Sequence, residues 1–320
     1  MRVRLDALAL IVRPVRNIPA ATAFYQDALG FLPRDGHEEG PWTMHTMQQI
    51  AGTLGAAWGC AQAPQRWCIL GAGDQSLALV ECADLPPADP DSGANDVRFQ
   101  HIAVVVNDMD AAWRRLLRCD PALRCVGHGG PQKLPPAAGG VIAVKFRDAD
   151  GHPVELIAFP PETSHHAWQS AASQASTTAG PTLGIDHSAI SIASADASIH
   201  FYRDQLGLCV AQRQTNSGEA QAQLDGVPDP RVEVVALQVA RHPTPHLELL
   251  GYQQPAPVTG MARASARTPR TTLVWYAEVA ASGEVGSNTV GSMNDPDGHL
   301  HVWLPGSAAA TAEANDPPAH

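Results

Sequence analysis

Residues 148–160 read DADGHPVELIAFP, and residues 295–305 read DPDGHLHVWLP. Each stretch contains an Asp-Gly turn signal followed by a run in which apolar residues alternate with others. This pattern predicts a tight turn that leads into a β-strand. Because the two stretches end two halves of the chain that repeat each other elsewhere, the sequence indicates an internally duplicated fold.

Further segments show the same repeat. FYQDALGF at residues 24–31 matches FYRDQLGL at residues 201–208, and each predicts a short helix with one apolar face and a glycine at its end. Short apolar strands precede them, LDALALIV from Leu5 and IDHSAISI from Ile185, and FQHIAVVV at residues 99–106 resembles these strands. The first half therefore contains two units of about 80 residues, and the second half contains a third unit and a shortened fourth. Short helices among many strands predict an α+β fold with mixed sheets, not a doubly wound sheet.

The composition of two segments sets the boundaries of the halves. Ser, Ala, Thr and Gly dominate residues 161–182, which predicts an interdomain linker. Residues 306–320 have a similar character and predict a flexible tail. We therefore expect an N-terminal domain at 1–160, made of modules 1 and 2, and a C-terminal domain at 183–305, made of modules 3 and 4.

The overall composition argues against several classes of function. The 320 residues carry 21 Lys and Arg against 32 Asp and Glu, for a net charge of -11. Such an acidic chain lacks the basic stripe that nucleic-acid binding needs. No apolar run is long enough for a membrane span and no typical signal peptide is present, so we expect a cytoplasmic protein. The six cysteines form no CxxC pair, which favours reduced, mostly buried thiols over a disulfide framework.

The ordered set of repeats resembles the vicinal oxygen chelate superfamily, which includes glyoxalase I, extradiol dioxygenases, methylmalonyl-CoA epimerase and bleomycin-resistance proteins. Four βαβββ-like modules, the FY-x-D-x-LG helices and the D-x-DGH strands carry this resemblance. It implies two glyoxalase-like domains in which paired modules curl their mixed sheets around a cavity. It also implies a metal ion there, held by a His or Gln from the first strand and a Glu from the fourth strand of each module.

Only two of the four modules have such residues at these positions. Module 2 offers His101 and Glu155, and module 3 offers His187 and Glu248. His301 of module 4 lies next to a ligand position, so strand alternation points it to the opposite face. The ligand positions of modules 1 and 4 are expected to hold the non-ligating residues Ala7, Ala78, Thr271 or Thr272, and Val302.

This distribution predicts how the modules pair. Pairing 1 with 2 and 3 with 4 would give each cavity two ligands, whereas three is the usual minimum for a catalytic metal. Pairing 2 with 3 collects all four residues in one cavity and leaves none between modules 1 and 4, as in the monomeric four-module glyoxalases that the chain resembles. We therefore expect one divalent ion (Ni, Co, Fe, Mn or Zn), bound by His101, Glu155, His187 and Glu248.

Other polar residues have less specific interpretations. His152 and His299 follow Asp-Gly turns and are expected to be exposed turn residues. Lys145 is a candidate contact for an anionic substrate. Trp168 lies in the linker, where it is expected to be solvated unless this segment covers the mouth of a cavity.

The expected ligand set favours proton-transfer chemistry. Four protein ligands leave two adjacent positions of an octahedral ion for neighbouring substrate oxygens, and such an ion stabilises an enolate or enediolate. Glu155 or Glu248 would then act as the base that moves the proton. We expect an isomerase, epimerase or glyoxalase-type lyase that acts on a small molecule, as a monomer or homodimer.

Two alternatives stay open. One is an Fe(II) ring-cleaving or other dioxygenase that uses two His and one Glu. The extradiol dioxygenases that this length resembles place their ligands in modules 3 and 4, and module 4 has none here. The other is a metal-free protein that binds a small molecule such as an antibiotic, for which the His/Glu set would be unnecessary.

Overall fold

The computed structural model describes residues 3–34, 42–60, 62–82, 84, 92–161, 168, 182–239, 242–259, 270–277 and 290–306. These residues form two mixed β-sheets, one of seven strands and one of nine, together with short helices. The predicted α+β class is confirmed.

The seven-stranded sheet joins strands of modules 1 and 4. Its order is β15-β16-β14-β1-β4-β3-β2, in which β1 is antiparallel to β14 and parallel to β4. The strands are β1 (Leu5–Val15), β2 (Leu32–Pro33), β3 (Trp67–Ala72), β4 (Gln75–Glu81), β14 (Thr272–Ala277), β15 (Gly291–Asn294) and β16 (Leu300–Pro305).

The nine-stranded sheet joins strands of modules 2 and 3. Its order is β11-β12-β13-β10-β5-β9-β8-β6, with β7 paired to β8. The sheet order therefore pairs module 2 with 3 and module 1 with 4. The strands are β5 (Gln100–Val106), β6 (Arg124–Cys125), β7 (Gln132–Lys133), β8 (Ile142–Arg147), β9 (Pro153–Ala158), β10 (Thr182–Ile192), β11 (Cys209–Ser217), β12 (Arg231–Val239) and β13 (His242–Gln254).

The helices begin and end at residues suited to those places. At four N-termini a side chain accepts a hydrogen bond from the backbone N–H three residues on, which satisfies one exposed donor of the first turn. These N-cap residues are Asn17, Thr43, Asp108 and Ser194. The helices are α1 (Ile18–Ala23) with the π-helical turn η1 (Phe24–Ala28), α2 (Met44–Trp58), α3 (Met109–Cys119), the 3-10 turn η2 (Pro136–Ala138), α5 (Ala195–Leu206) and α6 (Glu219–Asp225).

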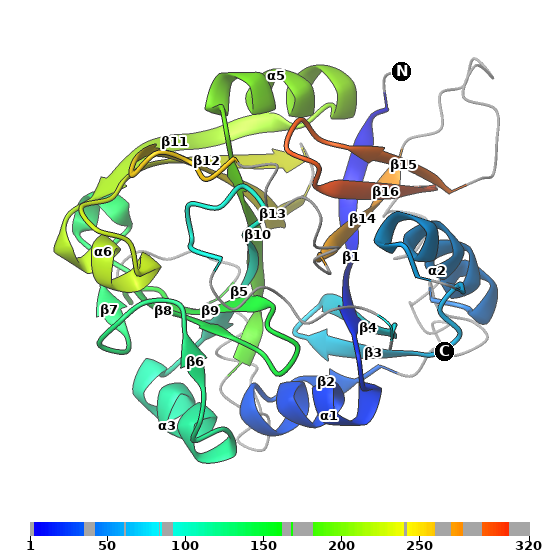
Figure 1. Ribbon diagram of the computed structural model, residues 1–320, viewed down its shortest axis with the longest axis horizontal. Helices are drawn as coiled ribbons and strands as arrows, with labels where there is room; N and C mark the ends of the chain where they lie inside the picture. Colours follow the sequence, from blue (N-terminus) through cyan, green and yellow to red (C-terminus); the bar gives the residue numbers. More distant parts are fainter. Residues whose placement is uncertain are drawn as a thin grey trace, which may run out of the picture.

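Two helices lie inside the curled sheets. In Figure 1 the seven-stranded sheet curls around α2 on the right, and the nine-stranded sheet curls towards α6 on the left. Both helices occupy the same place in their modules, between the second and third strands. Helix α2 has 15 residues and α6 has 7, so the helix at this place is about twice as long in module 1 as in module 3.

The repeated motifs join the modules within each half. The Tyr25 hydroxyl, from the first FY motif, donates to Asp148 Oδ2 at 2.7 Å. The Tyr202 hydroxyl, from the second, donates to Asp295 Oδ2 at 2.8 Å. Each aspartate begins the D-x-DGH motif of the next module, so the two motifs recur together because they bind each other.

The prediction that His152 and His299 are exposed is wrong, because they are 2% and 1% exposed. Nε2 of His152 lies 2.7 Å from the carbonyl oxygen of Pro14, and Nε2 of His299 lies 3.3 Å from that of Ser191. The turn directs each ring inward onto the first strand of the preceding module. A turn motif by itself does not show which way the following side chain points.

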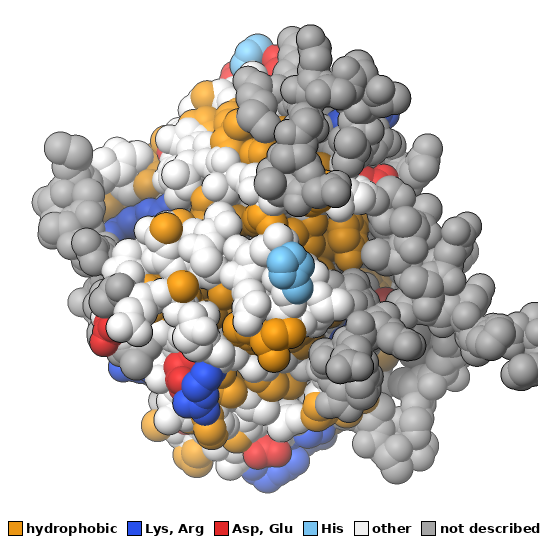
Figure 2. Space-filling view, turned by 90° about the vertical axis from the view of Figure 1, so that its right-hand side faces the viewer, with side chains coloured by type: hydrophobic (Ala, Val, Ile, Leu, Met, Phe, Trp, Pro, Cys, Tyr) orange, Lys and Arg blue, Asp and Glu red, His pale blue; other side chains and the backbone are white. Residues whose placement is uncertain are grey.

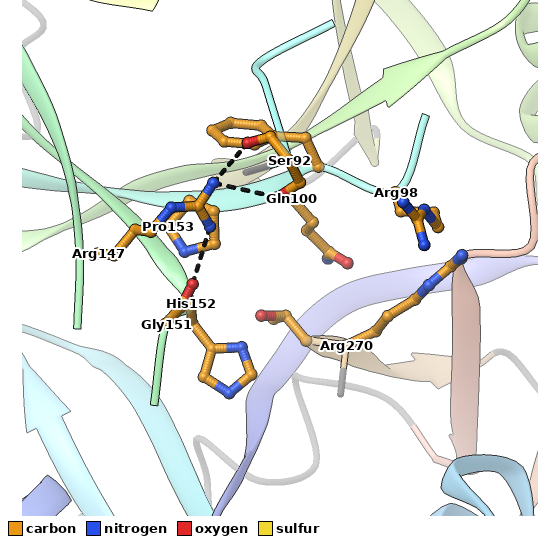
Figure 3. A pocket seen from close by; sticks show the side chains of 10 residues that line it. Ser92, Arg98, Gln100, Arg147, Gly151, His152, Pro153 and Arg270 are labelled. Carbon is orange, nitrogen blue, oxygen red and sulfur yellow. Dashed lines mark hydrogen bonds between the residues drawn. The ribbon is translucent and has the colours of Figure 1, made fainter. Parts of the chain in front are cut away.

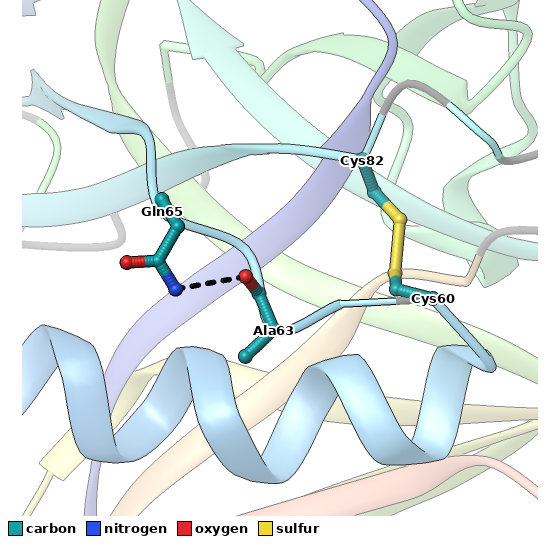
Figure 4. The surroundings of a disulfide bond; sticks show 4 residues. All are labelled: Cys60, Ala63, Gln65 and Cys82. Carbon is teal, nitrogen blue, oxygen red and sulfur yellow. Dashed lines mark hydrogen bonds between the residues drawn. A yellow bond between two sulfur atoms is a disulfide. The ribbon is translucent and has the colours of Figure 1, made fainter.

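Cys60 and Cys82 form a disulfide, which contradicts the expectation that all six cysteines are reduced thiols. Cys60 follows the end of α2 and Cys82 follows β4 (Figure 4). Their Cα atoms are 6.6 Å apart, within the range of a disulfide, although the sequence separates them by 22 residues. Cys119, Cys125 and Cys209 are free and exposed, not buried.

On the face that Figure 2 shows, Lys and Arg side chains of the described residues stand in small separate groups. Within the described ranges, no helix has the length and apolar composition of a membrane span.

Candidate metal centre

Four adjacent strands of the nine-stranded sheet carry the four predicted ligands. His101 lies on β5, Glu155 on β9, His187 on β10 and Glu248 on β13, and these strands run in the order β13-β10-β5-β9. In each module the residue two positions after the histidine is in register with the glutamate. Because residues two apart on a strand share a face, as do cross-strand neighbours, all four side chains lie on one side of the sheet.

The four side chains lie close together there. His101 Nε2 is 2.8 Å from Glu155 Oε2, and His187 Nε2 is 3.5 Å from Glu248 Oε2. Ligand atoms of His101, Glu155 and His187 all lie within 4.8 Å of one another. These three residues are buried, whereas the Glu248 side chain is 20% exposed. The arrangement consists of a buried group of three and a fourth carboxylate nearer to solvent.

Asp186 belongs to this site although the sequence analysis did not identify it. Its Oδ2 accepts a hydrogen bond from Nδ1 of His187 at 2.9 Å, and its Oδ1 accepts one from Nε1 of Trp168 at 3.1 Å. Neighbouring residues on a regular strand face opposite sides, which hides such a pair in the sequence. Here the pairing of β10 with β5 shifts between Ile185 and His187, and this bulge turns Asp186 towards His187.

His246 is a second residue that the sequence analysis did not identify. It lies on β13 with its Nε2 3.4 Å from Glu248 Oε1, and its Nδ1 is 3.9 Å from Asp186 Oδ2. Asp186, His187 and His246 make a second possible metal-binding group, which shares His187 with the first. The sequence offered one signal, since His246 stands two residues before Glu248 and so shares its strand face.

Lys145 is buried beside the same site. Its Nζ donates to Asp225 Oδ1 at 2.7 Å and lies 4.0 Å from Glu155 Oε2. Tyr252 and Gln221 both donate to the other Asp225 oxygen at 2.7 Å. This network fixes the ammonium group in the protein interior, so the structure gives no support to the prediction that Lys145 contacts an anionic substrate.

The surrounding charges shift the pKa values of His101 and His187 in opposite directions. Burial and the charge of Lys145 lower the pKa of His101 to about 4, so its ring is neutral and can offer a lone pair. Burial also lowers the pKa of His187, but the charges of Glu248 and Asp186 outweigh it and raise that pKa to about 9. Burial raises the pKa of Glu155, yet Lys145 and His101 outweigh it and lower that pKa to about 2. The carboxylates are therefore charged in this buried site.

The unsatisfied ring nitrogens provide a test of whether a metal ion fits these residues. Among the described residues, both nitrogens of His101 and Nε2 of His187 are buried without a hydrogen-bond partner of proper geometry. Such atoms are costly in a protein interior unless something binds them. Two imidazoles and carboxylates are suitable ligands for Zn, Ni, Fe, Co or Mn ions. The residues present therefore fit a divalent ion.

Modules 1 and 4 present a different picture at the equivalent place. The histidine position lies two residues before the residue that is in register with the glutamate position. In modules 1 and 4 this assigns the four positions to Leu10, Ala78, Thr272 and Val302, all 1% exposed or less. The expectation of Ala7 is wrong, because the residue in register with both Ala78 and Thr272 is Val12, which lies two positions after Leu10. Apolar residues of α2 fill the space over these positions, namely Met47, Ile50, Leu54 and Trp58.

Comparisons with known proteins agree with the predicted resemblance. A model of the Glyoxalase/Bleomycin resistance protein/Dioxygenase superfamily matches residues 7–156. No curated protein matches the sequence. The resemblance stated from the sequence is confirmed by this family match.

Solved structures share the fold across the whole chain. Glyoxalase I from Zea mays is 15% identical with a TM-score of 0.57, over 99% of this chain and 97% of that one. A protein described as a "putative dioxygenase" from Bacillus subtilis is 14% identical with a TM-score of 0.50, over 95% of this chain and 86% of that one. At such identities the likeness concerns the fold alone.

Proposed function

We propose that this chain, whose residues 7–156 match the Glyoxalase/Bleomycin resistance protein/Dioxygenase superfamily, is a metal-dependent vicinal oxygen chelate enzyme. Its single active site lies between modules 2 and 3. The observation that carries the proposal is the buried group of His101, Glu155 and His187, in which three ring nitrogens have no hydrogen bond of proper geometry to any described residue. The space between modules 1 and 4 is filled by apolar side chains, so a second site is not expected.

The residues divide between holding the ion and moving a proton. His101 and His187 would bind the ion through Nε2, and Glu155 through its carboxylate. When bound, the ion supplies a Lewis acid for two neighbouring oxygens of a substrate. His187 is oriented for this role, because Asp186 holds its other ring nitrogen.

Glu248 is the best placed base. It is the more exposed of the two carboxylates, and its position outside the group of three leaves it able to reach a substrate. Burial raises its pKa, but the charge of His187 and the hydrogen bond from His246 outweigh burial and lower it. Glu248 is therefore ionised and able to accept a proton. A positioned base beside a Lewis acid favours isomerase, epimerase or glyoxalase-type lyase chemistry.

One observation favours a second candidate function. The group of His101, Glu155 and His187 contains two histidines and one carboxylate, which is the ligand set of non-haem Fe(II) oxygenases. If Glu248 stays off the ion, three coordination positions are open. A dioxygenase is therefore the alternative.

Metal content of histidine variants tests where an ion binds. We expect about one divalent ion per chain in the purified protein. His101→Ala should lose it, whereas His246→Ala should retain it if the ion lies in the first group and not in the second. His200→Ala, at an exposed position of α5, is the matched control and should keep full metal content. Two ions per chain, or full metal in His101→Ala, would contradict the proposal.

Glu248→Gln distinguishes the two reactions. In proton-transfer chemistry this variant should keep the metal and lose about 100-fold or more of the activity, the usual contribution of a general base. In a dioxygenase the same variant should keep its activity, and oxygen uptake with catechols should be measurable with the unmodified protein. Equal oxygen uptake by the unmodified protein and by Glu248→Gln would reject the assignment of Glu248 as the base.

A further inference from the structure

A small pocket lies between the two sheets, separate from the candidate metal centre. Figure 3 shows its lining, in which Gln100 comes from β5, Arg147 from the end of β8, and Arg270 from the segment before β14. Gln100 is the neighbour of His101 on β5. Because neighbouring residues on a strand face opposite sides, this pocket and the metal centre lie on opposite faces of β5.

Three arginines line the pocket, and the protein holds each of them in place. Arg98 pairs with Asp96 at 2.8 Å. Arg147, which is 5% exposed, donates to a backbone carbonyl at 2.9 Å, and Arg270 donates to another at 2.8 Å. The guanidinium groups come from three separate segments and are fixed before any ligand arrives. Groups ordered in advance lose little conformational entropy when they bind.

Arg98 and Arg270 repel each other. Burial, followed by the charge of Arg98, lowers the pKa of Arg270. The carboxylates of Asp295, Asp96 and Asp297 act in the opposite direction without reversing the shift. A negative charge between Arg98 and Arg270 would relieve this repulsion.

Two polar atoms of the lining also lack partners. Gln100 Oε1 and Thr271 Oγ1 are buried and have no hydrogen-bond partner among the described residues. Gln100 and Thr271 are 4% and 2% exposed. Figure 3 shows the Gln100 amide directed towards the space between Arg98 and Arg270. An amide oxygen only accepts hydrogen bonds, so a ligand there must also carry a donor.

We propose that this pocket binds a small oxyanion that carries a hydroxyl group, of the class of bicarbonate or hydrogen phosphate. The oxygens of the anion would accept from the guanidinium groups, which suit planar bidentate partners. Its hydroxyl would donate to Gln100 Oε1, and Thr271 would complete the contacts. The cavity of about 30 Å³ favours the smaller bicarbonate.

Thermal unfolding of the full chain, in added sodium bicarbonate, phosphate, acetate or chloride at constant ionic strength, tests the proposal. We expect bicarbonate to raise Tm saturably, by about 3 °C at ten times its Kd. A rise with phosphate as well would mean that the pocket accepts both hydroxyl-bearing oxyanions, whereas a rise with bicarbonate alone would assign the smaller one. An equal rise with acetate or chloride, or no rise with any anion, would overturn the proposal.

Substitutions in the pocket test whether the rise of Tm with bicarbonate comes from binding there. Arg270→Gln and Thr271→Val should each fold, and each should weaken the bicarbonate effect, Arg270→Gln by at least tenfold in Kd. Thr271→Val keeps the shape of a buried side chain and serves if the arginine variant is unstable. Arg231→Gln, an exposed arginine that contacts Gln253, is the matched control and should respond like the unmodified protein. An unchanged response in both pocket variants would reject the site. Because none of these positions belongs to the metal centre, this result is independent of the proposed enzymatic function.

Discussion

At the scale of single residues, the repeat of modules 2 and 3 predicts four residues of the candidate metal centre. The bulge in β10 adds a fifth, Asp186, that the strand pattern does not predict. His101 and Glu155 were recognised because His187 and Glu248 stand at equivalent places in a second module. The structure brings these residues onto one face of four adjacent strands. Asp186 was not predictable, because only the bulge in β10 turns it towards its neighbour His187.

Asp186→Asn tests whether this aspartate orients His187. An asparagine is a weaker acceptor for the Nδ1 hydrogen and permits the other ring tautomer, so Nε2 would be less available to an ion. Loss of such a supporting partner typically weakens metal affinity about 10–100-fold. Competition with a chromophoric chelator measures the Kd. Asp196→Asn, whose side chain is 89% exposed, is the control, and equal affinity in both variants would show that Asp186 has no orienting role.

His301 makes a prediction about acid stability. It is 1% exposed, accepts a hydrogen bond from Trp275 Nε1 at Nδ1, and has Nε2 2.9 Å from the Tyr202 hydroxyl. Burial lowers its pKa from 6.5 to about 4. The unfolded chain therefore binds this proton more readily than the folded one, and stability that is present above pH 6.5 is lost as the pH falls towards 4.

The difference in pKa corresponds to about 3 kcal/mol of unfolding free energy between those two pH values. His301→Gln should lack this contribution, so its stability should depend less on pH than that of the unmodified protein. Urea unfolding at several pH values measures both curves. Parallel curves would mean that His301 does not titrate in this range.

At the scale of elements, helix α2 covers the positions of modules 1 and 4 that correspond to the metal centre. Helix α2 places Met47, Ile50 and Leu54 over Leu10 and the other positions equivalent to the metal-centre residues, and all of these residues are buried. Its counterpart α6 is half as long and ends at Asp225, which pairs with Lys145 beside the metal centre. The sequence predicts that modules 1 and 4 lack metal ligands. It does not predict that α2 covers the equivalent positions.

The disulfide ties the end of α2 to the sheet that it covers. Closing a loop of about 22 residues by the Cys60–Cys82 bond should stabilise the folded state by about 3 kcal/mol, chiefly by restricting the unfolded chain. Urea unfolding with and without dithiothreitol should show this loss. The double variant Cys60→Ala and Cys82→Ala should unfold identically in both conditions. A similar reductant effect in that variant would trace the loss to another cysteine.

At the scale of the whole molecule, the two halves of the sequence do not correspond to the two sheets. Strand β5 of the first half pairs with β10 of the second, and β1 pairs with β14 in the same way. The sequence predicted this exchange through its ligand count, because only the pairing of modules 2 and 3 collects more than two ligands. It could not predict the register, which fixes Leu10 and not Ala7 as the counterpart of His187.

Separating the halves therefore gives a strong test of the shared site. Residues 1–161 contain His101 and Glu155, and residues 182–320 contain His187 and Glu248, so each half supplies two ligands. Each half alone also exposes the unpaired edges of two strands, which favours aggregation. We expect neither half alone to bind a divalent ion tightly, and the two halves refolded together to bind one ion per pair, as measured by metal content after gel filtration. The His187→Ala form of the second half is the control and should assemble without metal. A second half that binds its own ion tightly would show that the centre is not shared between modules 2 and 3.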